Sequence, residues 1–390
     1  MPKQKIGLIL TGGGARAAYQ VGVLKALAEF TPYRAQLPFS VVCGTSAGAL
    51  NAVTLAVNAR HFRKGVRYLL NIWNNARVTD IYRADVLGVL DNSGRWLLGL
   101  LLSMFGSNRL NRVSLLDNSP LRTFLERILP CELIQRQIDD GVLHALGITA
   151  SGYGSGQSVT FYQGAPDIKP WKRARRVGVP TRIDIRHLLA SAALPFVFPA
   201  EHVNREFFGD GSMRQMAPIS SALHLGAERV LVVGVGPRMA KEGDKRSKIE
   251  HYPSLAEIAG HALDSIFLDG LEVDLERLYR INHTVSAMPE SLRAQINLRP
   301  IEALVIRPSQ PLEKIAERYV GHLPWAIRVL LRLLGVRRGA NANLVSYLLF
   351  EKDYCRALIE LGYQDTLQRR PEIMQFMQQG GTPLCADPAQ

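Results

Sequence analysis

Val42-Cys43-Gly44-Thr45-Ser46-Ala47-Gly48 sets the architecture of this chain, because it joins a predicted strand at 39–43 to a predicted helix at 46–59. Its last five residues fit the pattern G-x-S-x-G, which makes physical sense at a strand–helix turn. There the serine hydroxyl projects above the carboxyl edge of a sheet, and helix N–H groups face developing negative charge. Ser46 is therefore the candidate nucleophile, and a plain strand–helix turn is the alternative.

The same arrangement occurs earlier in the chain. Residues 6–10 form an apolar, strand-like run that ends in Thr11-Gly12-Gly13-Gly14, and residues 16–30 carry apolar side chains at helical spacing. A strand, a glycine turn and a helix, repeated twice, are typical of a parallel sheet that helices cover on both faces. We therefore expect a three-layer α/β/α fold with a mostly parallel central sheet.

A segment at about 61–145 interrupts this rhythm, and we expect a helical insertion there. It contains the apolar block 96–105, which either lies in a membrane interface, caps an acyl pocket or forms a buried helix. The sheet resumes at 146–150, 159–162, 205–208 and 229–235, with a basic loop at 169–186 and a helix at 185–194. We expect these elements to belong to one catalytic domain, residues 5–240.

Beyond residue 240 the composition shifts, and we expect residues 241–390 to form a mainly helical C-terminal extension. The predicted elements are a linker at 241–248, helices at 258–280, 323–334 and 342–361, one strand at 304–308 and a loose tail at 380–390. The helix at 323–334 carries Trp325 and leucines beside arginines. That pattern indicates either contact with an anionic membrane or a packed helix with a solvated cationic edge.

Charge and cysteine content narrow the class of protein. The 390 residues include 47 Lys and Arg against 34 Asp and Glu, a formal charge of +13 that favours anionic partners. The four cysteines, Cys43, Cys131, Cys355 and Cys385, form no CxxC pair, which argues against a zinc site or a disulfide framework. No secretory signal and no apolar run of membrane-spanning length are visible. We expect a cytoplasmic protein without a metal or cofactor, with peripheral contact to the inner face of the membrane as a further expectation.

The loop Gly12-Gly13-Gly14-Ala15-Arg16 carries the second chemical signal. Three glycines let several backbone N–H groups point into one small volume, which suits an oxyanion or a phosphate. A dinucleotide site would require an acidic residue at the end of the second strand, where this chain has Cys43 to Ser46. A nucleotide-binding module is thus disfavoured, and a tight turn without a ligand remains the other alternative.

The general base is harder to identify. His251, His261, His283 and His322 come late enough for a Ser-His-Asp order, but none stands at a short strand end among turn residues. Asp210, in Gly209-Asp210-Gly211-Ser212, follows a predicted strand and lies between glycines. Spacing alone leaves a catalytic carboxylate and a simple Asp-Gly turn equally open.

These motifs, in this order, resemble the patatin-like phospholipase family of bacterial type. The resemblance covers residues 5–240 and rests on the glycine loop with Arg16, on Gly44 to Gly48, on Ser191-Ala192-Ala193-Leu194-Pro195 and on Asp210-Gly211. It implies a dyad without histidine, in which Ser46 is the nucleophile and Asp210 the base. It also implies an oxyanion site made by Gly12, Gly13, Gly14 and Arg16, with Gly44, Gly48 and Gly211 as motif glycines. Ala17 and Ser212 depart from the usual residues and affect loop geometry only.

We accordingly expect a serine lipid-acyl hydrolase that cleaves fatty-acyl esters of phospholipids or related lipids through an acyl-enzyme. A free aspartate has a pKa of about 3.9, so we expect burial to raise the pKa of Asp210. The alternative from another class is a catalytically silent lipid-binding or regulatory protein on the same scaffold. The basic residues of 169–186 either contact phospholipid headgroups or form a solvated loop. Nucleic acid is a less supported partner, because no recognition motif accompanies the charge.

Overall fold

The computed structural model describes residues 4–83, 114–236, 252, 254–293, 295, 298–333, 335 and 342–378. Five features of the sequence lie outside these residues: the apolar block 96–105, the linker 241–248, His251, Cys385 and the tail 380–390. The expectations attached to these features remain predictions.

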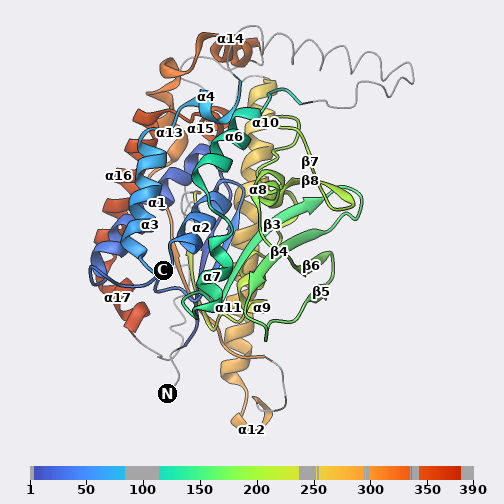
Figure 1. Cartoon of the computed structure of the whole chain (residues 1–390), viewed down its shortest axis with the longest axis vertical. Coiled ribbons are helices and arrows are strands. Elements are labelled where there is room, and N and C mark those ends of the chain that lie inside the picture. Colours follow the sequence, from blue (N-terminus) through green and yellow to red (C-terminus); the bar gives the residue numbers. More distant parts are fainter. Residues whose placement is uncertain are drawn as a thin grey trace.

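A ten-stranded mixed sheet forms the centre of the molecule (Figure 1). Eight of its strands follow the order β10-β9-β1-β2-β3-β4-β6-β5, and β8 pairs with β3 and β7 off this path. The strands are β1 Ile6–Leu10, β2 Val41–Thr45, β3 Ala145–Gly152, β4 Ser158–Gly164, β5 Trp171–Arg173, β6 Arg176–Pro180, β7 Glu201–Val203, β8 Glu206–Asp210, β9 Arg229–Val233 and β10 Glu302–Ile306. The run from β10 to β3 is parallel throughout, and β3 pairs antiparallel with β4 and with β8. The expected mostly parallel sheet is confirmed.

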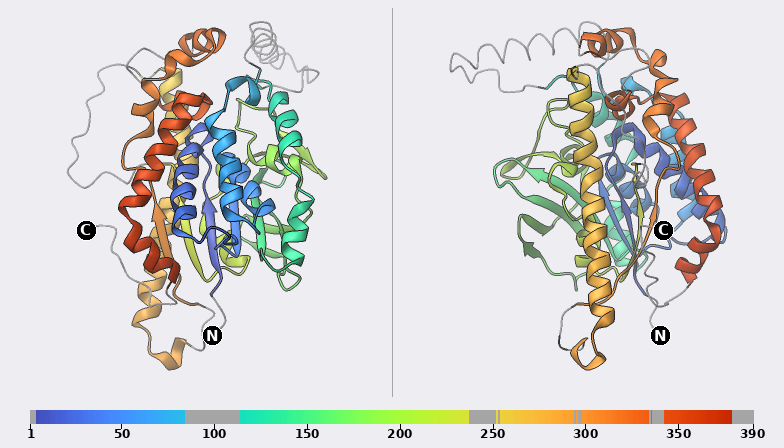
Figure 2. Two further views of the ribbon diagram at one scale, coloured as in Figure 1. Left: turned by 60° about the vertical axis from the view of Figure 1, so that its left-hand side comes forward. Right: turned by 180° about the vertical axis from the view of Figure 1, so that it is seen from behind.

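Helices cover both faces of the sheet (Figures 1 and 2). One face carries α1 Ala18–Phe30, α2 Ala47–Val57, α3 Phe62–Asn74 and α16 Lys352–Gln368, and the other carries α9 Pro218–His224 and α11 Gly270–Ala287. Side chains of β1 alternate between the two faces: Leu8 and Leu10 join the first core, whereas Ile9 joins the second. This alternation follows from the two-residue period of a strand and explains why every residue of β1 is apolar or glycine.

The remaining helical segments complete the described chain. They are η1 Gly14–Ala17, α4 Val78–Ile81, α6 Ser119–Ile128, α7 Leu133–Asp139, α8 Ile185–Ser191, η2 Gly211–Arg214, α10 Leu255–Asp264, the π-helical η3 Ser265–Asp269, α12 Glu290–Arg293, α13 Leu312–Glu317, η4 Val320–His322, α14 Trp325–Leu333, α15 Asn343–Leu348 and α17 Arg370–Gln378. The described part of the insertion is helical, as expected. Within the described residues, no helix is both long and apolar enough to cross a membrane.

Two sequence expectations need correction. The basic segment 169–186 is not a loop, because it contains the antiparallel hairpin of β5 and β6. The boundary near residue 240 does not divide the core either, since β10 pairs in parallel with β9 and completes the sheet. Helix α16 lies along α1, where Gly22 and Gly362 allow the two backbones to approach closely (Figure 2). The C-terminal segment is therefore an integral part of the fold.

Candidate active site

Ser46 occupies the sharp turn between β2 and α2. Its backbone has φ 53° and ψ −129°, an unusual conformation for a residue with a side chain. The turn is tight because two glycines allow it: a Cβ at Gly44 would lie 2.5 Å from the Gly48 carbonyl oxygen, and one at Gly48 would lie 2.3 Å from the Leu10 carbonyl oxygen. A strained serine at a strand–helix turn is the geometry expected for a nucleophile.

Asp210 ends β8 in a fully buried position. Its Oδ1 accepts a hydrogen bond from the backbone N–H of Ser212 at 2.9 Å, and its own N–H donates to the Ala193 carbonyl oxygen at 2.8 Å. Its Oδ2 has no hydrogen-bond partner among the described residues. A buried carboxylate oxygen without a hydrogen-bond partner is costly, and Asp210 remains the candidate base.

Strand β3 brings Ser46 and Asp210 together. Thr45, beside Ser46, pairs with Thr149, and Asp210 pairs with the next residue of β3, Ala150. Because β4 occupies the other edge of β3 as far as residue 151, β8 continues the line of β2 along the same edge. The serine turn and the aspartate therefore meet end to end, although they lie far apart in the sequence.

Ser191 fixes this junction, a role that the sequence did not indicate beyond the resemblance of its motif. The backbone N–H of Ser46 donates to Ser191 Oγ at 2.8 Å, and Ser191 Oγ donates to the Thr149 carbonyl oxygen at 2.6 Å. The serine turn is thereby tied to β3. Gly211 completes the close approach, because a Cβ there would lie 2.1 Å from the same carbonyl oxygen.

Burial controls the protonation of Asp210. Loss of solvation raises the pKa of its carboxyl group to about 6. The nearby hydroxyl of Ser46 and the hydrogen bonds from Ser212 act in the opposite direction and lower this pKa. The carboxylate is therefore mostly ionised at neutral pH yet far more basic than a solvated aspartate, which suits proton transfer.

The glycine loop lies against both of these groups. Gly13 and Gly14 adopt φ values of 161° and 54°, and Gly14 lines the same pocket as Ser46. A Cβ at Gly12 would lie 2.4 Å from Ser212 Oγ, next to the aspartate turn. The structure thus brings together the three motifs that the sequence singled out. The assignment of their N–H groups to an oxyanion remains a prediction.

The side chain of Arg16 forms hydrogen bonds with the C-terminal segment. It is buried at 1% exposure, and its Nε donates to Ser346 Oγ at 2.7 Å while its Nη1 donates to Tyr347 Oη at 2.9 Å. The guanidinium also contacts Asp264 and Asn343. All of these partners lie in the C-terminal segment. The side chain of Arg16 links the glycine loop to α10 and α15, and the contribution of Arg16 to the oxyanion site remains a prediction.

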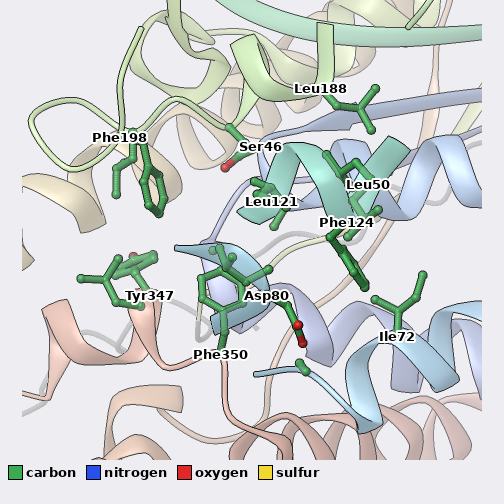
Figure 3. Close-up of a pocket in the computed structure, with 18 of the residues that line it drawn as sticks. Ser46, Leu50, Ile72, Asp80, Leu121, Phe124, Leu188, Phe198, Tyr347 and Phe350 are labelled. Carbon is green, nitrogen blue, oxygen red and sulfur yellow. The ribbon is translucent and has the colours of Figure 1, made fainter. Parts of the chain in front are cut away.

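An apolar pocket opens beside Ser46 (Figure 3). Its walls come from α2, the inserted helices α3, α4 and α6, helix α8 and the C-terminal segment; they include Leu50, Ile72, Leu121, Phe124, Leu188, Phe198, Tyr347 and Phe350. Asp80 is the one acidic side chain among the described lining residues. Sequence analysis identified none of these lining residues, because their only local signal is the apolar spacing of ordinary core helices.

Among the residues that the structure describes, no histidine lines the pocket beside Ser46. His261, His283 and His322 lie on the C-terminal helices, and the described pocket lining contains none of them. Among the described residues, no cluster of three or more His, Cys, Asp or Glu side chains could hold a metal ion.

Comparisons with known proteins identify a family. A family model described as patatin-like phospholipase matches residues 8–223. A curated relative, lysophospholipase nte1 of Aspergillus terreus, is 46% identical over 56 residues, which are 14% of this chain and only 3% of that protein.

Two solved structures resemble the chain weakly. VipD from Legionella pneumophila is 12% identical with a TM-score of 0.37, over 95% of this chain and 67% of that one. The type III effector protein ExoU is 18% identical with a TM-score of 0.24, over 89% and 79% of the two chains.

Proposed function

The chain belongs to the patatin-like phospholipase family, and on this premise we propose that it hydrolyses fatty-acyl esters of phospholipids or related lipids through Ser46 and Asp210. One observation carries the proposal. A strained serine adjoins a buried carboxylate with a free oxygen on one side and an apolar pocket on the other. That arrangement unites a nucleophile, a base and a site for an acyl chain.

The proposed reaction has two halves. The Oγ of Ser46 attacks the ester carbonyl carbon while its proton passes to Asp210, and N–H groups of the glycine loop stabilise the oxyanion. The tetrahedral intermediate collapses, the alcohol leaves with the proton from Asp210, and an acyl-enzyme remains. A water molecule then gives its proton to Asp210 and attacks the acyl group. The fatty acid departs as the proton returns to Ser46.

The apolar lining of the pocket suits the acyl chain of the substrate rather than its headgroup. Its described walls are almost entirely aliphatic and aromatic, and such a surface gains free energy when it covers methylene groups. A charged headgroup placed there would lose its hydration without a partner. We therefore place the acyl chain in the pocket and the headgroup at its mouth.

We also propose that a corner formed by α14 and the start of α10 contacts an anionic membrane. Trp325, Val329 and Leu333 lie four residues apart on α14 and are 57%, 40% and 79% exposed, so they form one apolar row. A Cβ at Gly335 would lie 2.7 Å from Ser254, which places the end of α14 beside exposed Leu255. An exposed apolar row with the cationic Arg332 on the same helix suits a bilayer interface.

A fluorophosphonate probe separates this proposal from a catalytically silent lipid-binding protein. We expect the probe to label wild-type protein at Ser46, and we expect labelling and ester hydrolysis to vanish in Ser46→Ala. Asp210→Asn should retain the fold and lose at least about a hundredfold in turnover, the usual contribution of a general base. Ser291→Ala, on the exposed helix α12, is the matched control. Wild-type protein that hydrolyses neither short- nor long-chain esters above the Ser46→Ala background, with and without anionic vesicles, would refute the proposal.

A further inference from the structure

The basic hairpin of β5 and β6 contributes to a second concavity that the proposed reaction does not use. This cavity has a volume of about 430 Å³ and is called here the basic pocket; it is lined by Lys5, His144, residues 167–173, His224 and Gly226. Four of the lining side chains are permanently cationic, namely Lys5, Lys169, Lys172 and Arg173, whereas Asp167 is the one carboxylate among the described lining residues.

The positive charge of the basic pocket is poorly neutralised. Lys5 Nζ lies 3.1 Å from His144 Nε2, and Asp167 is 3.9 Å from the same nitrogen. No described carboxylate forms an ion pair with Lys169, Lys172 or Arg173. Burial and the charge of Lys5 lower the pKa of His144, although Asp167 opposes them. Clustered cations in a concave wall raise the local concentration of anions.

The walls of the basic pocket favour recognition by charge. The indole of Trp171 stacks with Tyr162 at 5.2 Å and with His224 at 4.9 Å, and the backbone of Gly178 lies against it. These neighbours occupy the aromatic surface on which a nucleobase would otherwise stack. The groups left for a ligand are ammonium, guanidinium and imidazole donors, which suit phosphate oxygens.

The basic pocket and Ser46 lie at opposite ends of the parallel strands. Lys5 precedes β1 and His144 precedes β3, whereas Ser46 follows β2, which runs parallel to both. A strand of five residues spans about 17 Å. The reacting ester at Ser46 is therefore remote from the basic pocket, and a membrane that delivers this ester approaches the opposite ends of the strands. A ligand of the basic pocket must arrive from solution.

We propose that the basic pocket binds a soluble phosphate polyanion, such as a pyrophosphate or tripolyphosphate group carried by a small molecule. Its cations on the start of β1 and on the β5 hairpin hold the phosphates from two sides. Because the ligand binds this far from Ser46, it takes no part in the reaction and instead anchors the start of β1 to the β5 hairpin.

Isothermal titration calorimetry with tripolyphosphate tests the proposal without any catalytic readout. We expect saturable binding with one site in 50 mM salt, weakening steeply as the salt concentration rises. The double variant Lys172→Gln/Arg173→Gln and the single variant Lys5→Gln should each weaken binding at least tenfold, with melting temperatures close to wild type. Lys352→Gln, an exposed lysine on α16, removes one charge elsewhere and should leave binding within twofold.

Three results would overturn the proposal. The first is an absence of saturable tripolyphosphate binding below millimolar concentrations. The second is an equal loss of affinity in Lys352→Gln, which would indicate non-specific attraction to a basic protein. The third is sedimentation with vesicles of anionic lipid, or retention by a short RNA duplex, that the pocket variants abolish while tripolyphosphate fails to bind. That result would assign the pocket to a headgroup or to nucleic acid instead.

Discussion

At the scale of single residues, the site is defined by two side chains held in unfavourable states. Ser46 keeps a backbone conformation that costs free energy, and Asp210 keeps a carboxylate without solvent. Neither state persists unless the surroundings impose it. Gly48 and Gly211 leave room for neighbouring carbonyl oxygens, and Ser191 ties the serine turn to β3.

The protonation of Asp210 should set the acid limb of the pH profile. A base must be ionised, so kcat/KM for a soluble ester should rise with pH and level off above a midpoint near the pKa of Asp210, about 6. In Ser212→Ala, loss of a hydroxyl that lowers this pKa should move the midpoint to higher pH. Rates measured from pH 4.5 to 8.5 give both midpoints. A flat profile across this range would contradict the role of Asp210.

The raised pKa of Asp210 also predicts that the ionised carboxylate lowers the free energy of unfolding. The folded-state pKa of Asp210 lies above its unfolded value of 3.8, so the folded state binds the proton more tightly. Its stability should fall as pH rises from about 4 to about 6, by on the order of 3 kcal/mol at about 1.4 kcal/mol per pKa unit. Asp210→Asn should therefore be more stable than wild type at pH 8 and not at pH 4. Urea unfolding at the two pH values measures the difference, and equal differences would disprove it.

At the scale of elements, the glycine loop depends on helices that follow it by more than two hundred residues. Arg16 connects η1 to α10 and α15, its guanidinium lies over the Tyr347 ring at 3.9 Å, and Tyr347 stacks on Phe267 at 5.0 Å. Tyr347 and Phe267 also line the apolar pocket. The C-terminal segment thus shapes the loop and the pocket together.

Weakening the Arg16 connection should affect turnover more than substrate binding. In Arg16→Lys the charge remains but the forked contacts with Ser346, Tyr347 and Asn343 cannot all form. We expect kcat to fall about tenfold with KM within twofold, because displaced N–H groups stabilise the oxyanion less well. Arg60→Lys, in an exposed ion pair with Asp140, is the control. A change in KM alone would show that the connection shapes the pocket rather than the loop.

The row on α14 makes a separate prediction about membranes. Trp325→Ala combined with Leu333→Ser should reduce sedimentation with anionic vesicles at least about tenfold, since both changes remove exposed apolar surface. Hydrolysis of a soluble short-chain ester should stay within twofold. Leu298→Ser, which removes an exposed leucine outside α14, should change neither property. Unchanged vesicle binding in the double variant would exclude α14 as the contact.

At the scale of the whole molecule, the family motifs and the C-terminal segment form one core. β10 extends the sheet, and buried side chains of α16 such as Tyr354 and Leu358 join the core cluster that contains α1 and α2. The catalytic motifs all precede residue 212, yet the helix that follows the glycine loop is buried by residues beyond 350. A change that disturbs the packing of α1 against α16 should consequently lower both the stability and the activity of the protein.

The closest contact between α1 and α16 gives a sharp test. A Cβ at Gly22 would lie 1.9 Å from the Ile359 carbonyl oxygen, and one at Gly362 would lie 2.2 Å from the Tyr19 carbonyl oxygen. Gly22→Val or Gly362→Val should therefore lower the free energy of unfolding by at least about 2 kcal/mol through overpacking. Gly321→Ala meets no atom within 4 Å and should change it by less than about 0.5 kcal/mol. Near-wild-type unfolding of both valine variants would refute the close packing.

The sequence alone was sufficient for several features that depend on neighbours along the chain: the strands predicted at 6–10 and 229–235, the turn at Ser46, the glycine loop and the Asp-Gly turn. It also supported the order of motifs that names the family. It missed the hairpin of β5 and β6. The close approach of Ser46 and Asp210 depends on the pairing of both segments with β3. The position of the Arg16 side chain depends on α10 and α15. The pocket walls likewise come from helices whose apolar spacing matches any core. Local patterns report backbone preference and burial, whereas contacts between distant segments depend on how the whole chain packs, and that information is not contained in any short stretch.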